Sequence, residues 1–297
     1  MDFFQYDSNP WGQEILVRIS WDLLWAALIF GVLFVVGHLA MRKLWFPAHG
    51  ATAEKAAESK AATDDAAAPA GEAGEAGEAG SAGGANGDAP ARVRRHSLGS
   101  RLFHWTMAAA MFVLLITAFF PLLGIQFPWL TIHWVAGLVL IASILFHVVH
   151  ATLVMDLKAV WIGPSDVRDS WRRFARSIGR KAPDPALPGK YLVENKLYHH
   201  AVTVTGFGVA ITGVLMMFRI DTPLFARNPY MFAEQTWGWV YVVHGLSAVG
   251  LVGLIITHVY FAILPEKRWL TWSMINGWIS REKYVEHHDP ERWAPRD

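Results

Sequence analysis

The sequence contains no cysteine among its 297 residues. This absence excludes disulfides, iron–sulfur clusters with cysteine ligands from this chain, and c-type haem, which is attached through a C-x-x-C-H motif. Any haem held by the chain must therefore be bound noncovalently, through histidine or methionine.

Charge is also scarce. Asp, Glu, Lys and Arg make up 17% of the chain and sum to a formal charge of only +1, so no nucleic-acid partner is expected. Hydrophobic residues make up 53%, with 15 Trp and 17 Phe, and the mean hydropathy is +0.26. This composition is typical of a membrane protein surrounded by lipid rather than of a soluble globular protein.

Five segments are long and apolar enough to form membrane-spanning helices. We expect an all-α integral membrane protein in which a four-helix transmembrane bundle is joined by one extra N-terminal span. The predicted spans are 19–41, 102–122, 130–154, 197–218 and 238–264.

The distribution of Lys and Arg predicts the orientation. The loop at 156–196 carries nine of them, and others flank the ends of the spans that lie on the same side, whereas the loop at 123–129 has no charge. Basic loops stay in the cytoplasm. We therefore expect the N-terminus outside and the C-terminus inside. Because basic residues follow the long first apolar run where a cleavage site would lie, we expect that run to remain as a span.

The chain divides into three parts by composition. Residues 1–47 hold the extra N-terminal helix. Residues 48–91 are rich in Ala, Gly and Glu, include GEAGEAGEAG, and are predicted to form a disordered cytoplasmic linker because they cannot build a core. Residues 92–297 are expected to contain the four-helix core and a cytoplasmic tail.

His244 and His258 lie 14 residues apart on one apolar stretch. At ~1.5 Å and ~100° per residue, the two imidazoles point in the same direction and are ~21 Å apart along the helix. A histidine inside a membrane span is usually functional, and imidazole is a good iron ligand. The spacing therefore suggests two b-type haems, one near each face of the membrane.

The predicted topology supplies partners at matching depths. His104 begins the second span on the inner side, as His258 ends the fifth, and His133 begins the third span on the outer side, level with His244. We expect two sites with paired imidazole ligands, His104 with His258 and His133 with His244, each holding a haem iron. Hydrogen-bonded core histidines or a proton relay are the alternative interpretation.

The other histidines receive weaker interpretations. His38 has no partner at its depth. We expect His147 and His150, at the inner end of the third span, to be interfacial or hydrogen-bonded. We expect His199 and His200, at the start of the fourth span, to be available to a quinone or a proton. The histidines of the linker and tail should be solvated; they are His49, His96, His287 and His288.

Several motifs between residues 93 and 295 resemble the cytochrome b (gamma) subunit of membrane-bound respiratory formate dehydrogenase, within the wider bacterial di-haem cytochrome b561-like superfamily. They are RLFHWT at the first core helix, a histidine opening the next, GKY and a following lysine before the third, H-x13-H on the fourth, and the tail SMINGWISREKYVEHHDPERW.

The resemblance implies two haems b, with the family's ligand positions on the same four histidines. It also implies a bacterial inner-membrane location, with the N-terminus periplasmic. The implied partners are an iron–sulfur subunit, a molybdenum- or tungsten-containing catalytic subunit, and a quinone, either ubiquinone or menaquinone. Leu192 and Glu194 stand where the family has an Asn and a Gly near the quinone, and the first span and linker have no counterpart.

No catalytic constellation is present in the sequence, so its chemistry would be that of its cofactors. Our hypothesis is that electrons enter from the iron–sulfur partner at the outer haem, pass to the inner haem and reduce a quinone, with protons taken from the inner side. The residues expected near the quinone are Tyr191, Glu194, Asn195, Lys196 and His199.

Two inner segments are predicted to lie at the membrane surface: the basic loop 156–190, and residues 269–280, as one amphipathic helix. The uncharged loop 124–130 is either a docking surface for the iron–sulfur partner or a plain turn.

Three other functions remain open. The chain could serve a hydrogenase, a thiosulfate reductase or another molybdoenzyme; it could be a haem-free transporter that uses the histidines as a relay; or it could be an anchor without cofactors. A higher oligomer is also compatible with the sequence.

Overall fold

A computed structural model describes residues 3–45 and 91–295 of the chain. The chain forms two compact units, residues 1–29 with 91–297, and residues 30–90. Of the second unit, the described part is the continuation of the first helix. The linker predicted at 48–91 lies outside the described residues except for Ala91.

Five helices are long and apolar enough to cross a membrane, which confirms the predicted all-α membrane class. They are α1 (Trp21–Trp45), α3 (Leu98–Phe119), α4 (Trp129–Val154), α6 (Val193–Met217) and α7 (Glu234–Ile263). The last two begin four residues earlier than predicted because Val193–Lys196 and Glu234–Trp237, although partly polar, continue the helical hydrogen bonding.

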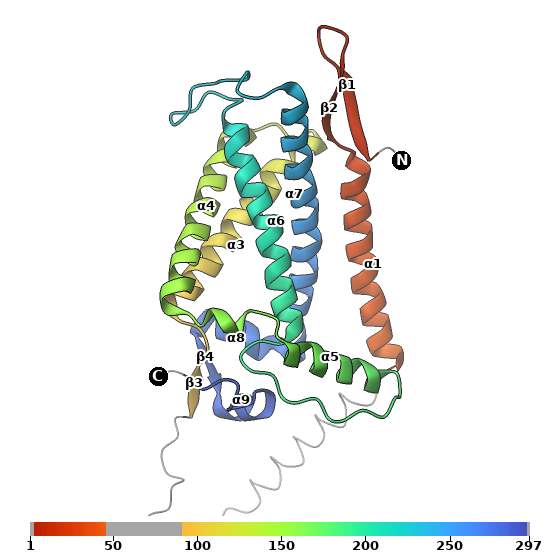
Figure 1. Ribbon diagram of the computed structural model, residues 1–297, viewed down its shortest axis with the longest axis vertical. Coiled ribbons are helices and arrows are strands. Elements are labelled where there is room, and N and C mark those ends of the chain that lie inside the picture. Colours follow the sequence, from red (N-terminus) through yellow and green to blue (C-terminus); the bar gives the residue numbers. More distant parts are fainter. Residues whose placement is uncertain (1–2, 46–90, 296–297) are drawn as a thin grey trace, which may run out of the picture. The chain divides into compact units, whose positions relative to one another are not determined.

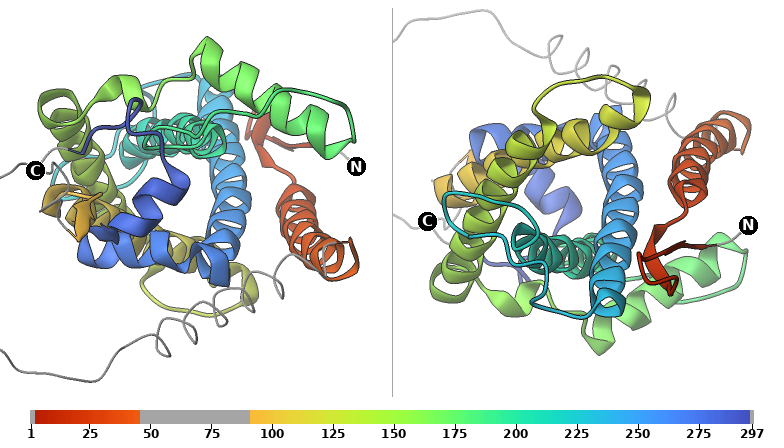
Figure 2. Two further views of the ribbon diagram at one scale, coloured as in Figure 1. Left: turned by 90° about the horizontal axis from the view of Figure 1, so that it is seen from below. Right: turned by 90° about the horizontal axis from the view of Figure 1, so that it is seen from above.

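The helices α3, α4, α6 and α7 form a four-helix bundle (Figure 1). Seen along its axis, the order around the bundle is α3, α4, α6, α7 (Figure 2), with the most extensive packing between α3 and α4 and between α6 and α7. Close packing of the second pair depends on a small residue, because a Cβ on Gly208 would overlap Ser247. Small residues let transmembrane helices approach each other closely.

A β-hairpin that was not predicted lies at one end of the bundle, which we call the outer end. Strands β1 (Phe4–Ser8) and β2 (Glu14–Ile19) pair antiparallel, and Gly12 turns the chain between them with a φ of 77°. Such a positive φ favours glycine.

The hairpin packs on the N-terminal half of α7. A Cβ on Gly238 would overlap the carbonyl oxygen of Leu16, and one on Gly245 would lie 2.9 Å from the Cδ1 atom of Ile19. The side chains of Leu16 and Ile19, both on β2, are buried against Val242. Two glycines one heptad apart therefore form the surface on which β2 lies.

Short elements close the opposite end, the inner end. They are α5 (Pro164–Ser177), α8 (Arg268–Asn276), α9 (Arg281–His287), the paired strands β3 (Arg92–Arg94) and β4 (Trp278–Ser280), and the 3-10 turns η2 (Leu157–Ala159) and η3 (Pro265–Lys267); a further turn, η1 (Pro121–Leu123), follows α3 at the outer end. The single helix predicted at 269–280 is wrong. Helix α8 ends at Asn276 because Gly277, with a φ of 92°, turns the chain into β4.

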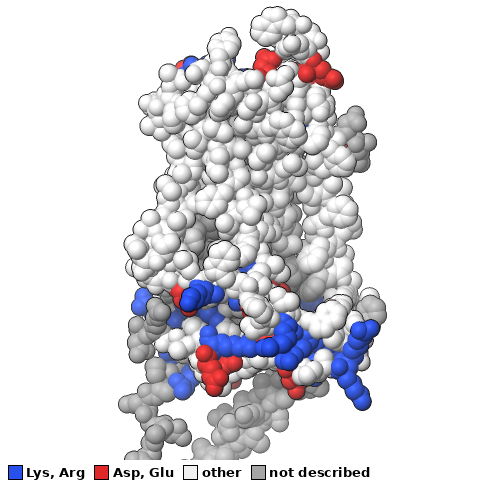
Figure 3. Space-filling model, in the orientation of Figure 1, with Lys and Arg blue, Asp and Glu red and all other residues white. Residues whose placement is uncertain are grey.

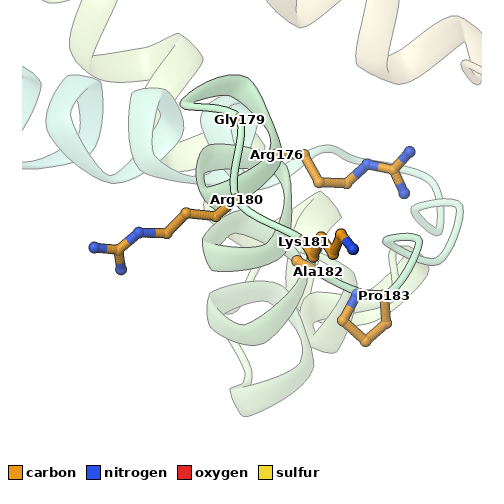
Figure 4. A pocket seen from close by; sticks show the side chains of 6 residues that line it. All are labelled: Arg176, Gly179, Arg180, Lys181, Ala182 and Pro183. Carbon is orange, nitrogen blue, oxygen red and sulfur yellow. The ribbon is translucent and has the colours of Figure 1, made fainter.

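Charged side chains gather at the ends of the bundle, with an uncharged band between them, and the Lys and Arg side chains lie mainly at the inner end (Figure 3). Helix α5 is amphipathic, with Trp171 exposed. A shallow hollow after it is lined by Arg176, Arg180 and Lys181, and the two arginines point away from each other (Figure 4). Diverging cations of this kind suit a charged surface such as lipid headgroups better than a single small ligand.

Candidate functional site

The outer pair of predicted site residues faces each other across the bundle. The rings of His133, on α4, and His244, on α7, have centres 6.4 Å apart and are inclined at 61°. The two side chains come from non-adjacent helices, so the pair spans the middle of the bundle (Figure 2).

Two threonines orient these imidazoles. The Nδ1 atom of His133 is 2.8 Å from the hydroxyl of Thr117 on α3, and the Nδ1 atom of His244 is 2.9 Å from the hydroxyl of Thr212 on α6. Each hydroxyl already donates its proton to a carbonyl in the preceding turn of its own helix. The threonines must therefore accept from Nδ1–H, which leaves the lone pair on Nε2 free to bind a metal.

The inner pair has a similar separation. The rings of His104, on α3, and His258, on α7, have centres 6.1 Å apart and are inclined at 55°. Tyr198, on α6, stacks on His258 with ring centres 5.3 Å apart, and its hydroxyl donates to the carbonyl of Leu254. An aromatic ring therefore limits the rotation of one member of this pair.

Both separations fit a metal bound between two imidazoles. A metal–nitrogen bond of about 2.0 Å and a distance of about 1.1 Å from nitrogen to ring centre place two opposed rings about 6.2 Å apart. The observed values of 6.1 and 6.4 Å lie on either side of this figure. The donor set, neutral imidazoles within apolar helices, suits haem iron. The residues present therefore fit the predicted group.

A third histidine pair with the same geometry was not predicted as a pair. His147, on α4, and His199, on α6, have ring centres 6.3 Å apart and an inclination of 57°. A signal was present in the sequence, because His147 follows His133 by 14 residues, the spacing that also separates His244 from His258.

The five residues predicted near the quinone do not form one cluster. Within the described residues, no hydrogen bond or ring contact joins any two of them. The amine of Lys196 binds the carboxylate of Asp166 at 2.8 Å and the carbonyl of Trp161, and so fastens α6 to α5. Glu194 and Asn195 are exposed at the start of α6, whereas His199 faces His147.

Tyr191 belongs to a different group, which we call the Arg95 cluster. The buried guanidinium of Arg95 lies over the rings of Tyr191, Trp269 and Trp293. It also contacts Nε2 of His288 at 2.9 Å and donates to the carbonyl of Lys190. The GKY motif and the tail are thereby held together.

His288 is buried in this cluster, so the prediction that it is solvated is wrong. Sequence reasoning placed it in a polar tail, without the aromatic residues that fold around it. Its Nδ1 atom lies 2.7 Å from the carbonyl of Gly189. Burial, together with the charge of Arg95, lowers the pKa of His288 to about 4.

Burial also disfavours the charged forms of the other two basic side chains of the cluster, Arg95 and Lys190. Burial lowers the pKa of Arg95 to about 10, and burial with the nearby charge of Arg95 lowers the pKa of Lys190 to about 8. Aromatic rings lie against both cations and partly offset the cost of burying them.

Comparison with known proteins agrees with the geometry of the bundle. The family model of prokaryotic cytochrome b561 matches residues 95–277, which is more than half of the chain. The match begins within the Arg95 cluster and ends at the glycine that terminates α8. No curated protein matches the chain.

Proposed function

Because the chain belongs to the prokaryotic cytochrome b561 family, an integral membrane family that binds haem b and transfers electrons, we propose that it is the membrane subunit of a respiratory oxidoreductase. In this proposal it takes electrons from an iron–sulfur partner and passes them to quinone in the bilayer. A formate dehydrogenase-like complex is the form that the GKY motif and the tail favour.

The observation that carries the proposal is the pair of opposed imidazoles at each of two depths. His133 with His244 and His104 with His258 would hold two haems b, one toward each face of the membrane. These histidines would hold haem iron, which would supply one-electron transfer.

The remaining residues fix and insulate these ligands. Thr117 and Thr212 hold the outer imidazoles in the tautomer that presents Nε2, and Tyr198 limits rotation of His258. The surrounding helices are apolar. Restricting tautomer and rotation in this way pre-organises a metal site.

The basic inner end supports an orientation with the C-terminus in the cytoplasm of a bacterial cell and the N-terminal hairpin in the periplasm. The iron–sulfur partner would then reach the chain from the periplasmic side, next to the outer pair. A molybdenum- or tungsten-containing catalytic subunit would complete the complex, and lipid would surround the bundle.

The first test counts haem in the purified chain. Dithionite-reduced minus oxidised spectra should show two haems b per polypeptide in the wild type and at most one in His133→Ala. The control His150→Ala, one turn beyond His147 on the same helix, should retain both. A colourless but folded wild type would refute the haem sites.

The second test identifies the complex. Subunits that co-purify with the chain should include an iron–sulfur protein and a molybdenum- or tungsten-containing protein, and formate should reduce the haems in the intact complex. Reduction by hydrogen instead would assign the chain to a hydrogenase. Isolation with no redox partner would contradict the proposal.

A further inference from the structure

The inner level of the bundle holds more imidazoles than two ligands require. Each helix of the bundle places at least one histidine five to seven residues from its inner end: His104, His147, His258, and both His199 and His200 on α6. At the outer level, by contrast, α3 and α6 supply threonines that bind the two histidines. His147 and His199, on α4 and α6, therefore do not take the place of these orienting threonines.

This pair lies between two neighbouring helices. Helices α4 and α6 pack side by side, and the ring centres of His147 and His199 are 6.3 Å apart. Phe103 stacks on His147 with ring centres 4.1 Å apart and planes inclined at 13°. His199 is exposed, so a ligand can reach the pair.

The separation allows one atom to contact both rings, and that atom could be a metal or an oxygen. Thr117 and Thr212 bond the Nδ1 atoms of the outer pair, whereas the Nδ1 atom of His147 is buried without a hydrogen-bond partner.

An oxygen ligand would use the hydrogen-bonding capacity of both rings. A neutral imidazole offers one N–H donor and one acceptor nitrogen, so two of them can bind a carbonyl oxygen or a hydroxyl. The neighbouring helix surfaces are apolar, with Phe146, Val149 and Val204 exposed. A ligand that approaches across these surfaces must dissolve in lipid.

We propose that His147 and His199 bind the same headgroup oxygen of a quinone or quinol at the α4–α6 interface, with Phe103 holding the ring of His147 in place. This inference rests on the proposed function, because it identifies residues for the quinone named there. It moves the site from the GKY loop, where Tyr191 is occupied by the Arg95 cluster, to the interface between two spans.

The experiment follows the reduction of haem by duroquinol in the purified, detergent-solubilised chain. We compare the wild type with His147→Leu and His199→Leu, and use His150→Leu and His200→Leu as matched controls from the same two helices. Haem and transition-metal content are measured in every preparation. We expect two haems in all five proteins, with reduction slowed at least tenfold in the first two variants and changed less than twofold in the controls.

Each other outcome has a defined meaning. Rates within twofold of wild type in His147→Leu and His199→Leu would overturn the site while leaving the proposed function in place. A wild type that binds two haems but does not react with duroquinol would overturn quinone chemistry, and the site with it. A third haem or a bound metal ion that is lost in these two variants would show that the pair binds metal. If a leucine variant does not fold, His147→Gln and His199→Gln replace it, and the same tenfold and twofold limits on the rate of haem reduction apply.

Discussion

Replacing the two orienting threonines tests whether the outer pair binds a metal. Thr117→Val and Thr212→Val keep the side-chain shape but remove the hydroxyl that accepts from Nδ1–H of His133 or His244. Each change removes one acceptor of a buried N–H, which keeps only the backbone carbonyl of Leu114 or Val209, so we expect a cost of about 0.5–1.5 kcal/mol. Loss of such outer contacts typically weakens metal binding about 10–100-fold.

The expected change in midpoint potential has a definite sign. An acceptor on Nδ1–H makes the imidazole a better electron donor and stabilises ferric iron more than ferrous iron. Its removal should therefore raise the potential, by about 59 mV for each tenfold difference between the two affinities. We expect a rise of tens of millivolts in one haem, with the other unchanged.

The assay is a redox titration of each variant with haem quantified per polypeptide. Thr205→Val is the control, because the Thr205 hydroxyl bonds only carbonyls of its own helix α6. Unchanged potentials and haem content in both threonine variants would refute the reasoning. An equal shift in Thr205→Val, or a shift in both haems, would also contradict it.

Three further predictions concern the ends of the bundle. Gly238→Ala should displace the hairpin, because the added Cβ overlaps the carbonyl of Leu16; we expect faster proteolysis near the N-terminus and a loss of about 1–3 kcal/mol, with Gly206→Ala unchanged. Arg95→Met should free the tail, because it removes the partner of His288 Nε2 and the donor to the carbonyl of Lys190. Limited proteolysis of the tail should then be faster. The control Arg94→Met, a change at an exposed position, should leave the rate unchanged. Docking of the tail should also weaken as the pH falls from about 6.5 to about 4, because the lowered pKa of His288 lets the undocked tail take up a proton that the docked tail does not; hydrogen exchange of tail amides should show this dependence in the wild type, and its absence would contradict the assignment.

The long helices could be predicted because membrane spans are defined by apolarity and length alone. The pairing of His104 with His258 and of His133 with His244 followed from depth, which is fixed by the 1.5 Å rise of a helix. These inferences need no knowledge of which helices are neighbours. The third pair needs that knowledge, because His147 and His199 face each other only once α4 and α6 are known to pack together.

The parts that could not be predicted depend on contacts between distant segments. Gly238 and Gly245 read as ordinary small residues of a span, and only the folded chain shows β2 lying on them. Arg95 and His288 are polar residues in polar segments, and their burial follows from Trp269 and Trp293 closing around them. A local sequence pattern contains neither relationship.

The hairpin also has a consequence for how the chain is made. Asn9 in the hairpin turn donates to the carboxylate of Glu234 at the start of α7, and these residues are 225 positions apart. Chains are synthesised from the N-terminus, so β1 and β2 are made well before α7, the helix on which they lie. Until then, Leu16 and Ile19 lack the side chain of Val242 that buries them. Docking of the hairpin therefore reports that α7 has reached its place.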